Sequence, residues 1–352
     1  MVKKVLYGLL LAAPVAIAGR LLGWDPVIVF IASALSVIPL ADIIGEATEE
    51  LAIHTGPKVG GLLNATLGNA AELIITIFAI REGLIDLVKA SITGSILGNL
   101  LLVLGFSVLF GGLKNGVQHF DRRTAALNGT LVLLAVIALV IPSMFDTAIA
   151  PNTIAETSFS EGVAIIMIVV YGLSVLYSFI EKKDDDLTRV AADVHEARWS
   201  VRRSLITLGL ATVAIAVLSE VLVSAVEPVT KSLGLTEFFI GIIIIPLVGN
   251  VAEHLVAVEV AIKNKMELSL AVSLGSSLQV ALFVAPLLVF ISLLFGHQLL
   301  LVFTTFELIA LFSASLVAAL VAVDGESNWL EGAMLLAVYL ICALAFFFLP
   351  AA

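Results

Sequence analysis

Long apolar runs separated by short polar segments are the main pattern of this chain. A run of about 20 apolar residues is long enough for an α-helix to cross a bilayer. Eleven such runs predict membrane-spanning helices, at 4–22, 26–44, 60–80, 85–112, 124–143, 159–180, 203–225, 238–262, 267–295, 299–323 and 328–349. The pattern therefore predicts an all-α polytopic membrane protein with about 11 transmembrane helices.

The first of these runs has two interpretations. It follows Lys3 and Lys4, and Ala16-Ile17-Ala18 is similar to the cleavage site of a secretory signal peptide. We favour a retained helix, because a polytopic protein needs no cleaved signal.

Composition supports the membrane class. The 352 residues are 61% hydrophobic and 13% charged, whereas soluble domains carry about 25% charged residues. The formal net charge of −10 says little about partners, because many acidic residues lie inside or beside apolar runs. We expect the lipid bilayer as a partner and no nucleic acid. The single cysteine, Cys342, excludes an intramolecular disulfide and a cysteine metal cluster.

The distribution of Lys and Arg predicts the orientation. With a cytoplasmic N-terminus, the cytoplasmic segments hold Lys3, Lys4, Lys58, Lys114, Arg122, Arg123, Lys182, Lys183, Arg189, Arg198, Arg202, Arg203, Lys263 and Lys265. The outer segments then hold only Arg20, Arg81, Lys89 and Lys231. Positive charge is retained on the cytoplasmic side, so this asymmetry favours a cytoplasmic N-terminus, an outer C-terminus and an odd number of spans.

The two halves of the chain repeat each other. Moving the first half along the sequence by one constant shift, which we call the repeat shift, aligns identical residues of the two halves. The aligned residues of the first half are Gly68, Asn69, Ala71, Glu72, Ala90, Gly94, Ser95 and Leu97. Their counterparts, in the same order, are Gly249, Asn250, Ala252, Glu253, Ala271, Gly275, Ser276 and Leu278. Five spans per copy is an odd number, so the second copy enters the membrane from the opposite face. This predicts an inverted-topology repeat, which many secondary transporters use.

This repeat divides the chain into four predicted parts. They are an N-terminal helix at 1–24, a first five-helix repeat at 25–180, an acidic cytoplasmic linker at 181–202 and a second five-helix repeat at 203–352. The linker is either a solvated connection or a regulatory segment that senses a cation, and its sequence leaves both interpretations open.

The repeated Gly-Asn-x-x-Glu motif carries the candidate chemistry. An ionisable side chain near the middle of a membrane helix costs about 2.5–3.5 kcal/mol and indicates a functional site by default. Asn69 and Glu72 lie three residues apart and share a helix face, and Asn250 and Glu253 do the same. Two copies of one such motif favour a site over a purely structural role.

The next span of each copy adds more oxygen-bearing side chains, namely Ser95, Asn99, Ser276 and Gln279. Small polar residues of this kind also pack helices together, so their role as ligands is less specific. Two carboxylates and several neutral oxygens suit a hard divalent cation, and Ca²⁺ tolerates flexible geometry better than Mg²⁺ does. Soft metals are disfavoured, while manganese and cadmium stay open as alternatives.

The same carboxylates suggest how transport is coupled. Glu72 and Glu253 cannot both stay ionised in a low-dielectric site without a cation, so protons and Ca²⁺ compete for them. His254 follows Glu253 directly and is either a proton relay or a hydrogen-bond partner of a neighbouring helix.

The motifs resemble those of the calcium/proton exchangers, a family of the cation/Ca²⁺ exchanger superfamily. The resemblance covers residues 56–73 (GPKVGGLLNATLGNAAEL), 245–254 (IPLVGNVAEH), 263–266 (KNKM) and 324–332 (DGESNWLEG). It implies a fold of two inverted five-helix repeats with an extra N-terminal helix. It also implies that Glu72 and Glu253 bind the cation and exchange protons, and that Asn69, Asn250, Ser95, Ser276 and Gln279 line the site.

The resemblance also indicates the counter-ion, and this chain departs from the family pattern at one position. This chain has Asn-Ala-Ala in the first motif and Asn-Val-Ala in the second, where sodium-coupled relatives carry Ser/Thr and Pro. The difference favours protons over sodium as the counter-ion. Glu259 stands where the family would have an apolar residue, and we expect an entry-path or surface role at most. The short N-terminus is more typical of a prokaryotic cell-membrane protein than of the plant vacuolar members.

Other acids have weaker interpretations. Glu46, Glu49 and Glu220 end the predicted second and seventh spans, where they would either form vestibules that attract cations or simply face water. A separate group before the last span is interpreted as structural: Asp324, Glu326 and Glu331.

The sequence therefore predicts a Ca²⁺/H⁺ antiporter that works by alternating access, with the second and seventh spans as moving helices. No cofactor is expected, because Ca²⁺ is the transported substrate. The alternatives are a Na⁺- or K⁺-coupled Ca²⁺ exchanger and a passive cation channel. An intramembrane enzyme ranks below them, because the motif spans show neither a nucleophile–base pair nor a histidine-rich metal motif.

Overall fold

The computed structural model describes residues 6–149, 153–181 and 197–349, and these are almost entirely helical. The first half contains η1 (Leu9–Leu11), α2 (Ala12–Leu22), α3 (Pro26–Leu67), α4 (Ala70–Arg81), α5 (Ile85–Leu97), η2 (Gly98–Val103), α6 (Leu104–Asn115), α7 (Arg122–Ile149) and α8 (Thr153–Glu181). The second half contains α10 (Val201–Leu233), α11 (Glu237–Phe239), η3 (Ile240–Ile244), α12 (Ile245–Ile262), α13 (Met266–Gln279), η4 (Val280–Val284), α14 (Ala285–Phe295), α15 (Thr305–Val323) and α16 (Trp329–Phe347). Two short strands complete the described part, β1 (Gln118–His119) and β2 (Glu326–Ser327).

The predicted spans are present. Among the described residues, 9 helices are long and apolar enough to cross a membrane, and the N-terminal helix Leu6–Leu22 is a shorter apolar one. The remaining predicted span, 60–80, is divided between the end of α3 and α4. The predicted fold class, an all-α polytopic membrane protein with an N-terminal helix and two five-helix repeats, is confirmed.

Some predicted boundaries were wrong. The second span was expected to end at 44, but α3 continues to Leu67 with a sharp bend at Gly56, where φ is 81° and ψ is 168°. A backbone with φ above zero is easily adopted by glycine, and the sequence does not show which glycine in a long apolar run will bend. The tenth span was expected from 299, yet α15 begins only at Thr305.

Local signals explain several helix ends. Gly23 ends α2 in the left-handed conformation, with φ at 68°. Asp25 then caps α3 by accepting a hydrogen bond from the backbone N–H of Val27 at 2.8 Å, and Pro26 occupies the first helical position. This tight corner turns the N-terminal helix back along α3.

The structure has two faces at which the helices end, and we name them after two residues. The Arg81 face is the side on which α4 ends, and there the Gly83 loop lies against His297. The Lys263 face is the side on which α12 ends, and there β1 pairs antiparallel with β2. Loops that the sequence places outside therefore meet on one face, and loops that it places in the cytoplasm meet on the other.

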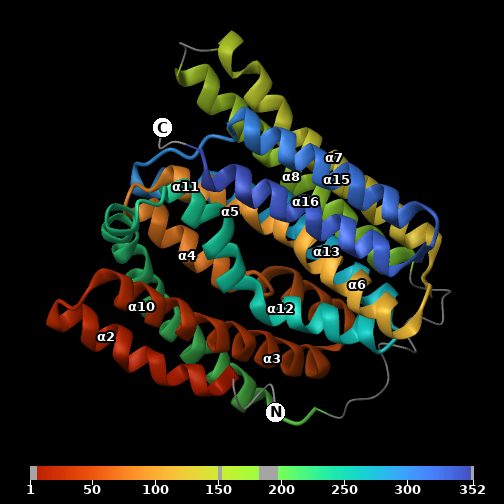
Figure 1. Cartoon of the computed structure of the whole chain (residues 1–352), viewed down its shortest axis with the longest axis horizontal. Coiled ribbons are helices and arrows are strands. Elements are labelled where there is room, and N and C mark those ends of the chain that lie inside the picture. Colours follow the sequence, from red (N-terminus) through yellow and green to blue (C-terminus); the bar gives the residue numbers. More distant parts are fainter. Residues whose placement is uncertain (1–5, 150–152, 182–196, 350–352) are drawn as a thin grey trace.

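Three helices lie together at one edge of the molecule. Figure 1 shows α2, α3 and α10 side by side, with α4 and α12 between them and the remaining helices. We call these three helices the α2–α3–α10 bundle and the group of α4, α5, η2, η3, α12, α13 and η4 the motif core. The predicted acidic linker falls mostly on 182–196, which lie outside the described residues.

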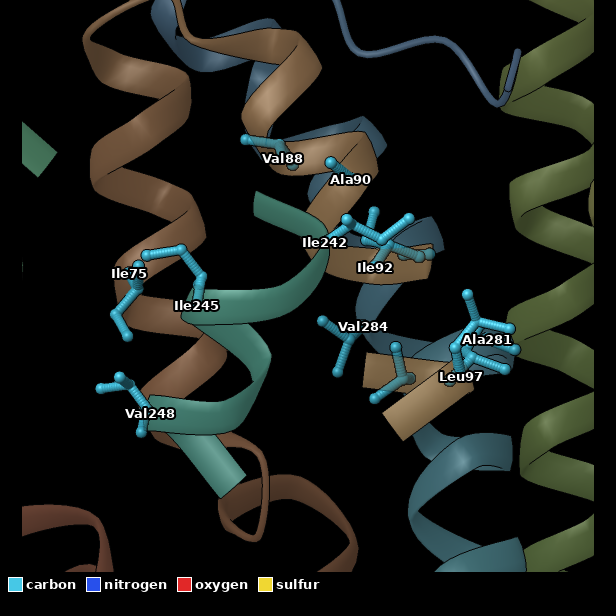
Figure 2. Close-up of a cluster of buried hydrophobic side chains, with 14 of the residues drawn as sticks. Ile75, Val88, Ala90, Ile92, Leu97, Ile242, Ile245, Val248, Ala281 and Val284 are labelled. Carbon is cyan, nitrogen blue, oxygen red and sulfur yellow. The ribbon is translucent and has the colours of Figure 1, made fainter. Parts of the chain in front are cut away.

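The motif core is held by apolar side chains and by close backbone contact. Figure 2 shows Ile75 of α4, Ile92 of α5, Ile242 of η3, Ile245 of α12 and Val284 of η4 in one cluster. Gly94 of α5 lies so close to the Ile242 carbonyl oxygen that a Cβ atom there would overlap it. Small residues permit such approaches between membrane helices.

Three segments of the motif core are π-helical, which the sequence did not predict. They are η2 (Gly98–Val103), η3 (Ile240–Ile244) and η4 (Val280–Val284). Short π-helical segments inside α-helices are frequent at functional sites. η2 and η4 occupy corresponding places in the two repeats. The predicted site residue Asn99 lies within η2, and Gln279 directly precedes η4.

Candidate functional site

The first motif sits at a break between two helices. α3 ends at Leu67, Gly68 and Asn69 form a turn, and α4 begins at Ala70. Glu72 therefore lies in the first turn of α4, where the partial positive charge of a helix N-terminus stabilises a carboxylate. The Glu72 side chain is buried, with 3% of its surface exposed.

The second motif sits inside an unbroken helix. Gly249, Asn250 and Glu253 all lie within α12, which continues without interruption from Ile245 to Ile262. Asn250 is buried at 1% exposure, whereas Glu253 is only partly buried. The two copies of one motif therefore occupy different local structures.

The two motifs pack reciprocally against each other. A Cβ atom on Gly249 would lie 2.9 Å from Cγ and 3.6 Å from Oε1 of Glu72. A Cβ atom on Gly68 would lie 3.3 Å from Oε1 of Glu253 and 3.6 Å from Oε1 of Gln279. Each motif glycine thus leaves the space that the glutamate of the other motif fills, and the two carboxylates come within electrostatic reach of each other.

Four of the predicted site residues form a hydrogen-bonded chain. Nδ2 of Asn99 donates to Oγ of Ser276 at 3.0 Å, and that hydroxyl donates to Oδ1 of Asn69 at 3.4 Å. Nδ2 of Asn69 donates to Oε1 of Gln279 at 2.7 Å. The chain joins the turn before α4 to α13 and η2, so it connects the two repeats.

Several buried polar atoms of the other site residues have no hydrogen-bond partner in the described part of the chain. Within the described residues, both carboxylate oxygens of Glu72, Oε2 of Glu253 and both amide atoms of Asn250 are buried without a hydrogen-bond partner. A buried polar group without a partner is costly, so a cluster of them indicates a place for a ligand. Oxygen atoms of carboxylates and amides are the ligands that a hard cation accepts.

The ligand types at the site bear on which kind of metal it could hold. No group of three or more His, Cys, Asp and Glu side chains is close enough to hold a metal among the described residues. Two carboxylates surrounded by amides and hydroxyls fit a transported cation better than a resident catalytic metal. Ser95 is buried on α5, but no hydrogen bond joins it to the other site residues in the described part of the chain.

His254 lies apart from this hydrogen-bonded chain. It lines an apolar groove between α12 and the η2–α6 helix, together with Val103, Phe106 and Val251. Its Nε2 atom is buried and has no hydrogen-bond partner within the described residues. The structure therefore does not show the helix-to-helix hydrogen bond that was one of the two interpretations, and the proton relay stays a prediction.

Sequence reasoning missed two buried acids, Glu50 of α3 and Glu307 of α15, and Glu307 lies nearer to the predicted site residues. Its Oε1 accepts a hydrogen bond from the Thr93 hydroxyl at 2.9 Å, and its Oε2 accepts from the backbone N–H of Thr304 at 2.8 Å. Glu307 thus joins the start of α15 to α5 directly before Gly94 and Ser95. The Thr-x-x-Glu spacing of a capping box was visible in the sequence, whereas the contact with Thr93 depends on the fold.

The other acids have distinct surroundings. Glu46 accepts a hydrogen bond from the Tyr7 hydroxyl at 2.9 Å, and the exposed Glu49 lies within electrostatic reach of Glu253. Glu259 is an exposed residue whose Oε1 lies 2.6 Å from Nζ of Lys263, which agrees with the expected surface role.

The group before the last span has contacts that fit its structural interpretation. Glu331 accepts from the backbone N–H of Asn328 at 3.1 Å as part of a capping box. Asp324 accepts from the backbone N–H of Glu326 at 3.3 Å.

Comparisons with known proteins place the chain in a family. The sodium/calcium exchanger protein family matches residues 26–180 and 203–348. The chain is 45% identical to a Ca(2+)/H(+) antiporter of Aphanothece halophytica, over 98% of this chain and 97% of that protein. It is 43% identical to the Ca(2+)/H(+) antiporter ChaA of Bacillus subtilis (strain 168), over 96% of each.

A solved structure agrees with these sequence matches. The crystal structure of the Ca2+/H+ antiporter protein YfkE superimposes with a TM-score of 0.86 at 41% identity, over 98% of this chain and 100% of that one. With matches over both halves and nearly the full length, this multi-pass membrane protein belongs to the sodium/calcium exchanger protein family.

Proposed function

We propose that this protein is a Ca²⁺/H⁺ antiporter, a secondary active transporter and not an enzyme. The observation that carries the proposal is the reciprocal packing of the buried Glu72 and the partly buried Glu253, each against the glycine of the other motif, with both oxygens of Glu72 and Oε2 of Glu253 lacking a hydrogen-bond partner among the described residues. Relatives that are 43% and 45% identical over nearly their whole length carry the name Ca(2+)/H(+) antiporter, which supports the same assignment.

The predicted site residues fall into two groups in this proposal. Glu72, Glu253 and Asn250 supply oxygens that have no other partner in the described structure. Asn69, Asn99, Ser276 and Gln279 form the hydrogen-bonded chain beside them, and Ser95 lies on the adjoining helix. Ca²⁺ accepts about six to eight oxygen ligands in flexible geometry, so water would complete the set.

Competition between ions supplies the coupling. Two carboxylates this close in a low-dielectric site need either a bound divalent cation or bound protons to offset their repulsion. Binding Ca²⁺ therefore displaces protons from Glu72 and Glu253, and binding protons displaces Ca²⁺. If the empty, doubly charged site cannot cross between states, each Ca²⁺ moves only in exchange for protons.

We further propose the orientation and the moving parts. The Lys263 face is cytoplasmic, because Lys and Arg are concentrated in its loops, and the protein lies in a prokaryotic plasma membrane. The chain then divides into an N-terminal helix at 1–24, repeats at 25–180 and 203–352, and a cytoplasmic linker at 181–202. The α2–α3–α10 bundle moves against the motif core, and the bend at Gly56 provides one hinge.

A Na⁺-coupled exchanger is the second candidate, and the name of the matched family favours it. The test is Ca²⁺ uptake into proteoliposomes that are loaded at acid pH and diluted into alkaline, sodium-free medium. We expect uptake above equilibrium that collapses with a protonophore.

Two other outcomes would contradict the proposal. Uptake that ignores the pH gradient but follows an imposed sodium or potassium gradient would establish a cation-coupled exchanger. Passive equilibration alone would indicate a channel. Glu72→Gln protein in the same vesicles controls for leak.

A further inference from the structure

Polar contacts hold the α2–α3–α10 bundle together at both faces. Near the Arg81 face, Nη2 of Arg20 donates to Oε1 of Glu220 at 3.3 Å, which joins α2 to α10. At the Lys263 face, the backbone of Trp199, just before α10, contacts two side chains of α3. Its N–H donates to Oε2 of Glu50 at 3.0 Å, and its carbonyl accepts from Nε2 of His54 at 2.7 Å. We therefore treat the three helices as one unit.

An ion pair between described residues crosses from this bundle to the motif core. Nη2 of Arg81 lies 4.0 Å from Oε1 of Glu220, the same oxygen that accepts from Arg20. Arg81 is the last residue of α4, where a cation is stabilised by the helix C-terminus, and its guanidinium lies 5.6 Å from the centre of the Phe78 ring. Glu220 is thus shared between the bundle and the core.

The core partner of this pair is the helix that carries Glu72. Arg81 follows Glu72 by nine residues, and at 1.5 Å per residue the pair lies about 14 Å from the candidate site along α4. A movement of the bundle relative to α4 at the Arg81 face must change the distance between Arg81 and Glu220. The ion pair therefore opposes separation of the bundle from the motif core at that face, and it breaks when they separate.

The positions that correspond to this pair under the repeat shift are uncharged. Under the repeat shift, which brings Gly68 onto Gly249, Glu220 corresponds to Pro39 and Arg81 corresponds to Ile262. Neither Pro39 nor Ile262 is charged, so the two inverted repeats differ at these positions. The repeat therefore does not place a second charged pair at the two corresponding positions.

We propose that Arg81 and Glu220 form an ionic latch that holds the bundle against α4 at the Arg81 face and opens when that face opens. The latch is a property of the fold, whereas its part in transport rests on the proposed exchange. The two side chains are 49% and 39% exposed, and exposed ion pairs have small energies. Loss of the latch is expected to change the ratio of the two conformations by up to about fivefold.

A distance measurement tests the latch without any transport assay. Cys342 is replaced by Ala, and spin labels are placed at two exposed positions, Ser224 on α10 of the bundle and Leu294 on α14, a helix that packs against α4 of the core. Distance distributions are then recorded in nanodiscs by pulsed electron resonance. We expect Arg81→Gln and Glu220→Gln each to increase the long-distance population by up to about fivefold. The exchanged pair Arg81→Glu/Glu220→Arg should restore the original distribution. It is made in an Arg20→Gln background, because Arg20 contacts residue 220 and would repel an arginine there.

Two matched variants serve as controls. Lys231→Gln removes an ion pair with Glu227 that lies wholly within α10, at 2.6 Å, and it should leave the distribution unchanged. Arg20→Gln removes the bond to Glu220 inside the bundle, and it should not produce the shift seen for Arg81→Gln. The latch is overturned if Arg81→Gln behaves like Lys231→Gln, or if the exchanged pair fails to restore the distribution.

Thermal unfolding of each variant identifies any that fails to fold. If a single variant fails, the distance distribution of the exchanged pair decides whether the latch exists. The outcome is also separable from the proposed function. A shift in distance with no Ca²⁺ uptake by the parent protein would keep the latch and reject the antiporter. Normal Ca²⁺ uptake by the parent protein, with an unchanged distance distribution in Arg81→Gln, would keep the antiporter and reject the latch.

Discussion

The two copies of the Gly-Asn-x-x-Glu motif have the same chemistry and different backbones. In the first copy the helix stops at Leu67 and resumes at Ala70, so that Gly68 and Asn69 form a turn. In the second copy α12 runs through Gly249 and Asn250 without a break. The preceding segments differ as well, because α3 bends at Gly56 whereas η3 leads directly into α12.

The surroundings of the side chains differ in the same way. Asn69 is fully engaged with Gln279 and Ser276, whereas Asn250 has no hydrogen-bond partner in the described structure. Glu72 is 3% exposed, and Glu253 is only partly buried. Inverted repeats that transport by alternating access cannot both have the same conformation while the site is open to one face only. The inequality of the two copies is therefore what the proposed mechanism requires.

Removing the charge of either glutamate has the largest expected effect. Glu72→Gln and Glu253→Gln preserve the size of the side chain but remove a charge that binds the cation, so each should reduce Ca²⁺ exchange by about 100-fold or more. Proteoliposome uptake measures the loss. Glu259→Gln is the control on the same helix as Glu253, and it should keep normal activity. Near-normal transport by either motif variant would mean that the two copies do not form one site.

Substitution of Gly94 and Gly275, which directly precede Ser95 and Ser276, should affect protein stability differently in the two copies. A Cβ atom on Gly94 would overlap the Ile242 carbonyl oxygen, whereas one on Gly275 would meet nothing within 4 Å. Gly94→Ala should therefore cost about 1–3 kcal/mol, and Gly275→Ala should be neutral or slightly stabilising because alanine favours helices. Thermal unfolding in detergent compares the two. Equal shifts would show that α5 and η3 are not in close contact.

Gly249→Ala should weaken the site without weakening the fold. Its Cβ atom would lie 2.9 Å from Cγ of Glu72, so the glutamate must move. We expect Ca²⁺ affinity to fall by about tenfold, with no loss of thermal stability since alanine is preferred within α12. Calorimetric titration measures the affinity. Gly209→Ala in α10, where a Cβ atom meets nothing within 4 Å, is the control and should bind normally.

The two asparagines should differ in their effect on stability without Ca²⁺. Asn69→Ala removes its hydrogen bonds with Gln279 and Ser276, so it should lower stability without Ca²⁺ by about 1–3 kcal/mol. Asn250→Ala removes no hydrogen bond and should leave that stability unchanged. Both should reduce the extra stability that Ca²⁺ provides, which is about 2.7 kcal/mol at 100 times the dissociation constant. A loss of cation-free stability in Asn250→Ala would show that Asn250 is bonded in the protein.

The sequence by itself determined the membrane class, the repeat and the residues of the candidate site. Apolar runs of membrane length and a carboxylate inside them are local properties, because the bilayer imposes the helix and the cost of the charge wherever the segment packs. The repeat shift then related Glu72 to Glu253 before any contact was known. The alternation of the loops between two faces follows from the count of spans.

Only the tertiary structure decided how the two copies differ. The turn at Gly68 and Asn69, the bend at Gly56 and the π-helical segments depend on packing between helices that are far apart in sequence. The placement of Gly249 against Glu72 and the bond between Thr93 and Glu307 likewise join the first half of the chain to the second. A pattern along one helix records which face is apolar, but not which partner meets that face or how closely. Nearly identical motifs therefore acquired different structures.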